Sequence, residues 1–278
     1  MTRLTQSSKH NEMLAATAAG PMPVVIVPAK ALTKPGKSRW PARLDLLQSL
    51  SGLLLALFLM AHMAFVSSIL ISHDAFYTVA RFFEGAYFLR KPYPILVSGV
   101  VAGILALFIG HAWLALRKFP AGFRQYRAFV AHKNRLRHGD TSLWWLQVWT
   151  GFALFFMATI HLYQMLMNPS LIGPYESADR VWTGNLWPLY LLLLFAAELH
   201  ASVGLYRLAL KWGWFDAADP NRSRRRLRWV KHGLSAFFIT LGLVTLGAYI
   251  DLGRAHAEHA GERYVPSSLS APADSGRH

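Results

Sequence analysis

An all-α integral membrane bundle of five transmembrane helices is the fold that this sequence predicts, and three observations support it. Apolar residues make up 54% of the 278-residue chain and charged residues only 15%, whereas soluble domains carry about 25% charge. Five stretches are long and apolar enough to span a hydrocarbon core about 30 Å thick, which takes roughly 20 helical residues. The basic residues gather in blocks between these stretches, as topology signals do.

The five predicted spans contain almost no charged residues. Glu198, in the fourth span, is the one Asp, Glu, Lys or Arg found within them. The last span is the shortest. In chain order the spans are residues 46–71, 95–116, 143–167, 187–206 and 233–250.

The basic blocks predict the orientation of the bundle. They precede the first span, separate the second span from the third, and separate the fourth from the fifth, where residues 222–231 are rich in arginine. The loop between the third and fourth spans has only one basic residue, Arg180. The positive-inside rule therefore places the N-terminus in the cytoplasm and the C-terminus in the periplasm. We expect a flexible cytoplasmic tail over residues 1–43, a membrane domain over 44–251 and a disordered periplasmic tail over 252–278.

Composition also excludes several kinds of site. The chain has no cysteine, so it can form no disulfide, attach no haem through C-x-x-C-H and hold no Cys-ligated iron–sulfur cluster. The formal net charge is +15, but membrane topology explains the basic blocks better than nucleic-acid binding does. A redox metal would need histidine, methionine or oxygen ligands.

Four histidines lie deep within four different spans, which is costly unless each has a partner. His62 and His161 are about 16 and 18 residues into spans that run outward, so both lie near the outer face. His111 and His200 are about 16 and 13 residues from the outer ends of spans that run inward, so both lie nearer the cytoplasm. The four histidines therefore form two pairs at two depths, and the pairs are separated by roughly 10–16 Å along the membrane normal.

Two histidines at one depth on different helices can bind one haem iron from both sides. Two such haems would carry electrons across most of the membrane. The alternatives from the residues alone are a histidine-lined proton path and plain contacts between helices. Glu198 is either a protonated structural glutamate or part of a proton relay. Glu84 and Arg180 lie in predicted loops. For each, the alternatives are a functional role and an ordinary solvated side chain.

The longer motifs show a family resemblance. LFLMAHMAFV (57–66), HAWLALRKFP (111–120), HGDTSLWWLQVWTG (138–151) and ELHASVGLYRLALKWGWF (198–215) closely resemble the dihaem cytochrome b anchor of quinol:fumarate reductases, in its single-subunit epsilonproteobacterial form. The resemblance covers roughly residues 39–251, and the last of these blocks is the most specific.

The resemblance implies roles for particular residues. His62 and His161 would bind the haem far from the soluble subunits, and His111 and His200 the haem near them. Glu84 would serve quinol oxidation, although its local context FFEGAYFLRKP is only loosely alike. Glu198 would return protons through the membrane in parallel with electrons. Four residues fall where the family has polar or basic residues near the haems: Arg180, Gln48, Ser49 and Lys118.

The resemblance implies a multi-pass subunit of the bacterial inner membrane that takes part in anaerobic respiration. It would oxidise menaquinol and pass electrons through two bis-histidine haem b groups to an iron–sulfur subunit and an FAD-containing flavoprotein that reduces fumarate. A dimer of such heterotrimers is compatible with this reading. One alternative is the anchor of a succinate dehydrogenase, which runs from succinate to quinone as in the tricarboxylic acid cycle; another is a haem-free histidine-lined transporter. The cytochrome b of quinol:cytochrome c reductases is discounted, because it uses two histidines on each of two helices.

Overall fold

The computed structural model describes residues 38–136, 139–215 and 219–270, and every regular element in these ranges is a helix. The predicted all-α class is therefore confirmed. The described residues from Pro41 onward belong to one compact unit, and five helices of the described ranges are long and apolar enough to cross a membrane. Residues 1–37, most of the predicted N-terminal tail, lie outside the described ranges.

The spanning helices extend beyond most of the apolar stretches that predict them. The bounds of α4 agree with the prediction, but α9, predicted as the shortest span, is 36 residues long. The arginine-rich segment forms the first turns of α9 instead of a loop, because hydropathy marks only the part of a helix that lies in hydrocarbon. The five helices are α2 (Trp40–Val66), α4 (Ile95–Leu116), α6 (Gly139–Met167), α8 (Trp187–Lys211) and α9 (Pro220–Ala255).

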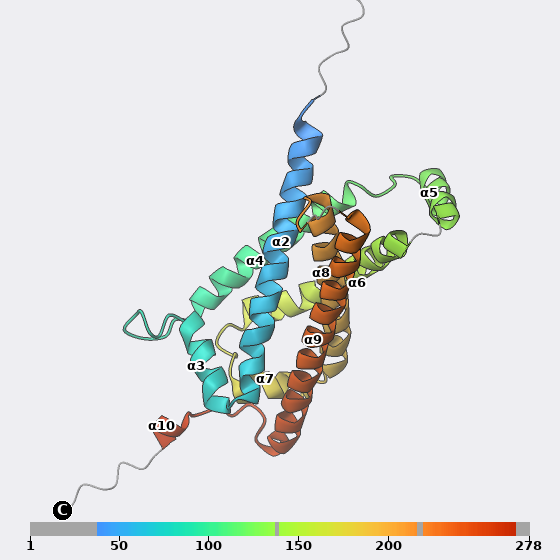
Figure 1. Cartoon of the computed structure of the whole chain (residues 1–278). Coiled ribbons are helices and arrows are strands. Elements are labelled where there is room, and N and C mark those ends of the chain that lie inside the picture. The colour runs from blue at the N-terminus through green and yellow to red at the C-terminus, as the bar shows by residue number, and fades with distance from the viewer. Residues whose placement is uncertain (1–37, 137–138, 216–218, 271–278) are drawn as a thin grey trace, which may run out of the picture. The chain divides into compact units, whose positions relative to one another are not determined.

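Shorter helices occupy the segments between the spans, and the sequence prediction did not include them. They are η2 (Ser67–Leu70), α3 (His73–Phe83), α5 (Phe123–Leu136), α7 (Pro174–Val181), η3 (Ala257–His259) and α10 (Ser267–Ser270). Figure 1 shows α5 and the arginine-rich start of α9 toward one end of the bundle, which we call the basic end, and α3 and α7 toward the opposite end.

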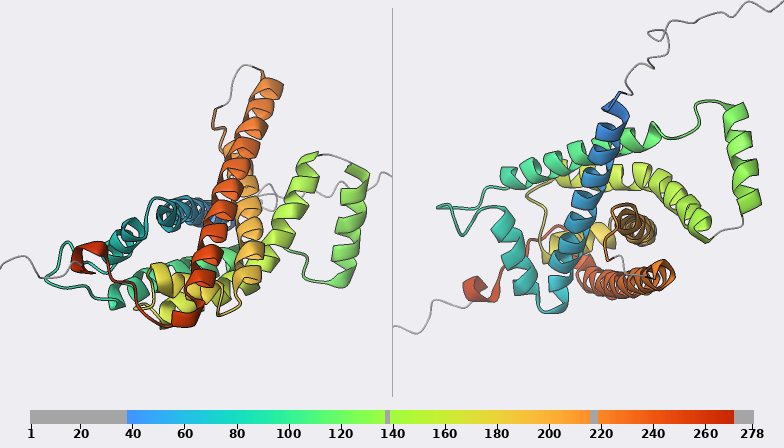
Figure 2. Two further views of the ribbon diagram at one scale, coloured as in Figure 1. Left: turned by 90° about the horizontal axis from the view of Figure 1, so that it is seen from below. Right: turned by 45° about the horizontal axis from the view of Figure 1, so that its top comes forward.

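Helix α8 is central to the packing, since it contacts both α6 and α9 along its length, while α4 packs on α6. The views in Figure 2 show α8 and α9 side by side. Polar side chains add bonds between helices, as is common in membrane bundles. The hydroxyls of Ser67 and Thr245 lie 2.8 Å apart, and the Tyr249 hydroxyl donates to the Val66 carbonyl at 3.1 Å.

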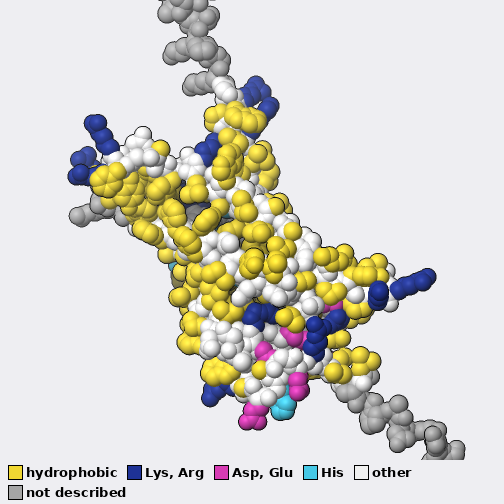
Figure 3. Space-filling model, turned by 180° about the vertical axis from the view of Figure 1, so that it is seen from behind, with side chains coloured by type: hydrophobic (Ala, Val, Ile, Leu, Met, Phe, Trp, Pro, Cys, Tyr) yellow, Lys and Arg dark blue, Asp and Glu magenta, His cyan; other side chains and the backbone are white. Residues whose placement is uncertain are grey.

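The outer surface of the spanning helices is apolar. Trp113, Phe156 and Leu192 are each at least 60% exposed. In Figure 3, hydrophobic side chains cover much of the upper and middle part of the visible face, while lysine and arginine side chains lie at its edges and, beside acidic side chains, in its lower part. Such a surface would be unfavourable in water, whereas it suits contact with lipid chains, because its side chains are apolar and the backbone polar groups within a helix are bonded to one another.

The C-terminal segment differs from the predicted disordered tail of residues 252–278. Helix α9 continues to Ala255, and residues 256–267, which we call the C-terminal strap, are bonded to Asp74 and Asp179. The prediction was wrong for residues 252–270 because the partners of this polar segment are carboxylates far away in the sequence. Residues 271–278 lie outside the described ranges.

Candidate functional site

A cavity of about 1060 Å³ lies within the bundle, and all four span histidines line it. Its walls are mainly apolar side chains of α2, α4, α6 and α8, with α3, α7 and α9 contributing at the opposite end. A pocket for one drug-sized ligand usually measures about 300–1,000 Å³. The cavity is therefore large enough for more than one flat organic group.

The histidines lie in two pairs across this cavity. The ring centroids of His111 on α4 and His200 on α8 are 6.4 Å apart, and those of His62 on α2 and His161 on α6 are 6.0 Å apart. An imidazole nitrogen binds a first-row metal at about 2 Å, so two rings on opposite sides of one metal have centroids roughly 6 Å apart. Each pair has the spacing that two axial ligands require.

Hydrogen bonds orient the rings of the pair at the basic end. His111 Nδ1 lies 3.0 Å from the Ser51 hydroxyl, which itself donates to the Gln48 carbonyl. His200 Nδ1 donates to the Gln147 carbonyl at 2.9 Å. Because these bonds engage Nδ1 of both rings, Nε2 of each ring stays available to a metal.

Two glycines let these rings lie against neighbouring helices. A Cβ atom on Gly52 would lie 2.9 Å from Cε1 of His111, and one on Gly151 would lie 3.0 Å from Cε1 of His200. Cβ atoms in proteins rarely make contacts as short as these. Glycine is therefore needed at both positions for the rings to lie where they do.

Packing, more than hydrogen bonding, holds the second pair. The His62 ring stacks on Phe58 with centroids 5.6 Å apart, and the His161 ring meets the edge of Tyr190 at the same distance. The buried Nδ1 of His161 has no hydrogen-bond partner within the described residues. A buried polar atom of this kind is costly unless a further group satisfies it.

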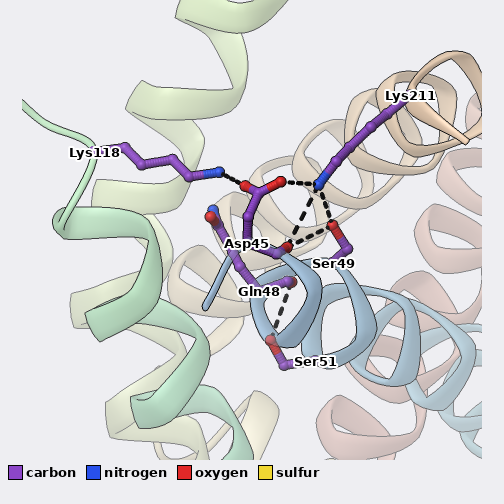
Figure 4. Close-up of polar contacts among 6 residues, drawn as sticks. All are labelled: Asp45, Gln48, Ser49, Ser51, Lys118 and Lys211. Carbon is purple, nitrogen blue, oxygen red and sulfur yellow. Dashed lines mark hydrogen bonds and ion pairs between the residues drawn. The ribbon is translucent and has the colours of Figure 1, made fainter. Parts of the chain in front are cut away.

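A cationic cluster lies at the rim of the cavity at the basic end (Figure 4). Lys118 and Lys211 reach the Asp45 carboxylate from two sides and both form ion pairs with it. Lys211 also donates to the Ser49 hydroxyl at 2.7 Å, and the buried Gln48 Oε1 has no hydrogen-bond partner among the described residues. With two ammonium groups and one carboxylate, the cluster has an excess positive charge that suits the carboxylate of a ligand.

The sequence prediction included Gln48, Ser49 and Lys118 but missed Asp45 and Lys211. Asp45 precedes Gln48 by three residues and so lies on the same face of α2. Lys211 lies within the most specific of the family-like blocks. The sequence therefore marked both residues, but only the fold shows that Asp45 of α2 and Lys211 of α8 form an ion pair.

Arg180 of α7 lines the cavity at the opposite end. Its Nη2 donates to the Leu171 carbonyl at 2.7 Å, and its Nη1 lies 3.5 Å from Sδ of Met165. The guanidinium is thereby fixed on the same side of the bundle as His161. It is placed to face an anionic group in the cavity.

Glu84, at the end of α3, is 1% exposed and forms an ion pair with Arg81, one turn earlier. Burial raises the pKa of the Glu84 carboxyl, and the nearby charges of Arg81 and Arg263 offset only part of this rise. Glu84 is not among the residues that line the cavity, although Ala80 and Phe83 of α3 are. The structure therefore places Glu84 beside the cavity wall instead of inside the cavity.

Glu198 of α8 is 3% exposed and lines the cavity, two residues before His200.

Within the described ranges, no group of three or more His, Asp or Glu side chains is close enough to hold a bare metal ion. Each histidine pair offers two facing imidazole rings, a donor set that suits a metal whose remaining ligands come from its own organic ring, as in a porphyrin.

Comparison with known proteins identifies the family of this chain. Residues 123–241 match the family described as succinate dehydrogenase/fumarate reductase transmembrane subunit. The chain is 56% identical over 223 residues to the fumarate reductase cytochrome b subunit of one Helicobacter pylori strain, covering 80% of this chain and 86% of that protein. It is 52% identical over 217 residues to the protein of the same name from Wolinella succinogenes, covering 78% of this chain and 85% of the relative. The chain therefore belongs to the fumarate reductase cytochrome b subunits, the membrane anchors of an oxidoreductase complex.

Proposed function

We propose that this chain binds two haem b groups, one between each histidine pair, and conducts electrons between menaquinol and soluble partner subunits. The observation that carries the proposal is the spacing of the two ring pairs, 6.0 and 6.4 Å, within one cavity. When bound, the haems would supply one-electron transfer, and the two histidine pairs would hold them.

The charged residues near the cavity complete the two haem sites. Lys118 and Lys211, with Gln48 and Ser49, are available to propionate groups at the basic end, and Arg180 is available at the opposite end. Lysine and arginine form charge-assisted bonds to carboxylates. The order of these groups along the bundle supports one haem toward each side of the membrane.

We infer that the basic end faces the cytoplasm, because positive residues are enriched in cytoplasmic segments. An iron–sulfur subunit and an FAD-containing flavoprotein would bind at this end, and fumarate would be reduced to succinate on the flavoprotein. The family also includes succinate dehydrogenase subunits, so the same chain would serve in succinate oxidation if the complex ran in reverse. Redox titration of the haems against the native quinone distinguishes the two directions.

Menaquinol oxidation would take place at the opposite end, beside Glu84. The half-reaction releases two electrons and two protons from the quinol, breaks both O–H bonds and leaves menaquinone. The Glu84 carboxylate would accept one of these protons, and water would take the other. Burial raises the pKa of Glu84 above its ordinary value, and a higher pKa makes its carboxylate a stronger proton acceptor.

Glu198 would carry protons back across the membrane in step with the electrons. A carboxyl group in a membrane interior is costly and is usually retained for function. Glu198 is buried, lines the cavity and is on the helix that also carries His200. Proton movement in the same direction as the electrons would offset the charge that they transfer.

Replacing Gly151 with alanine tests the haem at the basic end. The added Cβ would meet the His200 ring at 3.0 Å, so we expect one of the two haem components in a reduced-minus-oxidised spectrum to weaken or shift in potential. Gly103→Ala is the matched control, since no atom lies within 4 Å of its added Cβ. Equal loss of both components, or no change in either, would contradict the assignment.

Replacing Glu84 with glutamine tests the quinol site. We expect quinol-driven turnover to fall at least about 100-fold, the usual contribution of a general base, while both haem spectra remain. Asp251→Asn, which neutralises an exposed carboxylate of α9, should retain turnover. Normal turnover in Glu84→Gln would reject the role of Glu84 in proton acceptance.

Replacing Glu198 with glutamine in vesicle-reconstituted complex tests the proton return. We expect slower quinol-driven turnover and a membrane potential that is absent with the unaltered protein, because electron movement would no longer be offset. Glu198→Asp should recover part of the effect. The relay role is wrong if both turnover and membrane potential in Glu198→Gln equal those of the unaltered complex.

A further inference from the structure

The C-terminal strap is bonded at both ends to carboxylates of other helices. At its start, Asp179 of α7 accepts from His256 Nδ1 and from the Gly261 N–H, each at 2.9 Å. At its end, Asp74 in the first turn of α3 accepts from the Tyr264 hydroxyl at 2.8 Å and from the Ser267 hydroxyl at 2.5 Å. The strap therefore connects α7, which carries Arg180, with α3, which leads to Glu84.

Aromatic rings fill the space beneath the strap. The Tyr175 ring of α7 stacks on His256 at 4.1 Å and meets the edge of the Tyr264 ring at 5.2 Å. The Tyr264 ring also lies 5.9 Å from that of Tyr77 on α3. Contacts of this kind add to the hydrogen bonds and favour one position of the strap.

The origin of the strap is also fixed. A Cβ on Gly253, in the last turn of α9, would lie 2.6 Å from both the Ala178 carbonyl oxygen and Cβ of Trp182. Only glycine allows α9 to approach the α7 backbone this closely. The chain therefore enters the strap from a defined point.

Arg263 lies in the part of the strap that packs against α3. Tyr264, the next residue, lies beside Tyr77; the guanidinium of Arg81 covers the same Tyr77 ring at 4.8 Å and pairs with Glu84. Three charged groups act on Glu84: Arg81 on its own helix, Arg263 of the strap and Glu176 of α7. Both arginines lower the pKa of Glu84, whereas Glu176, like burial, raises it.

We propose that the C-terminal strap is part of the quinol-oxidation site, with Arg263 as a positioning residue whose positive charge favours the proton-accepting carboxylate form of Glu84. The inference rests on the proposed role of Glu84. It extends that role by assigning a function to a segment after the last spanning helix, which the sequence alone did not connect with any site.

The test is Arg263→Gln in the assembled complex, with quinol oxidation measured as a function of pH. Loss of the positive charge disfavours the Glu84 carboxylate, so the acid limb of kcat/KM should move to higher pH by several tenths of a unit and at most about one unit. Arg263→Lys should restore the original profile. The difference should shrink at high salt, since Arg263 is exposed.

Arg90→Gln is the matched control, because Arg90 is an exposed arginine of the loop between α3 and α4. It should leave the profile in place. Infrared titration of the carboxyl band that disappears in Glu84→Gln gives a readout independent of turnover, and this band should titrate at higher pH in Arg263→Gln.

The two proposals fail in different ways. If Glu84→Gln retains quinol oxidation, the proposed role of Glu84 itself is wrong. If Glu84→Gln is inactive but the profile and infrared titration of Arg263→Gln coincide with those of the unaltered complex, only the inference about the strap is overturned. Tyr264→Phe, which removes the bond to Asp74, should move the profile in the same direction as Arg263→Gln but by less.

Discussion

The rest of this structure depends on one constraint: two pairs of histidine rings must face one another across a single cavity. Four spanning helices must each present one histidine inward, and they must stay far enough apart for the rings of each pair to be about 6 Å from one another. Contacts of α8 with α6 and α9 hold the bundle together without closing this space. Gly52 and Gly151 let the rings of one pair lie close to neighbouring helices.

The two ends of the cavity are built differently. At the basic end, His111 and His200 have hydrogen-bond partners, and a cluster of Lys118, Lys211 and Asp45 lies at the rim. At the opposite end, ring packing holds the histidines, and a buried carboxylate stands beside the cavity wall. In the proposed function, the first arrangement would face the partner subunits and the second would accept protons from the quinol.

Much of the fold could be predicted from sequence, because long apolar stretches and histidine depth follow from helix geometry and the thickness of a bilayer. The short helices α3, α5 and α7 were missed, because they are amphipathic and do not form the long apolar stretches that predict a membrane span. The partners Ser51 and Gln147 of the histidines depend on contacts between helices, which composition does not reveal. For the same reason the tail that composition described as disordered contains the strap, whose anchors Asp74 and Asp179 are distant in sequence.

The most direct test is the haem content per chain of the purified protein, measured for the unaltered chain and for His161→Ala and His200→Ala. Two haems held by separate histidine pairs predict two per unaltered chain and about one in each variant, with different components of the absorption spectrum lost in the two cases. A colourless chain, or loss of the same component in both variants, would contradict the pairing of the four histidines across the cavity.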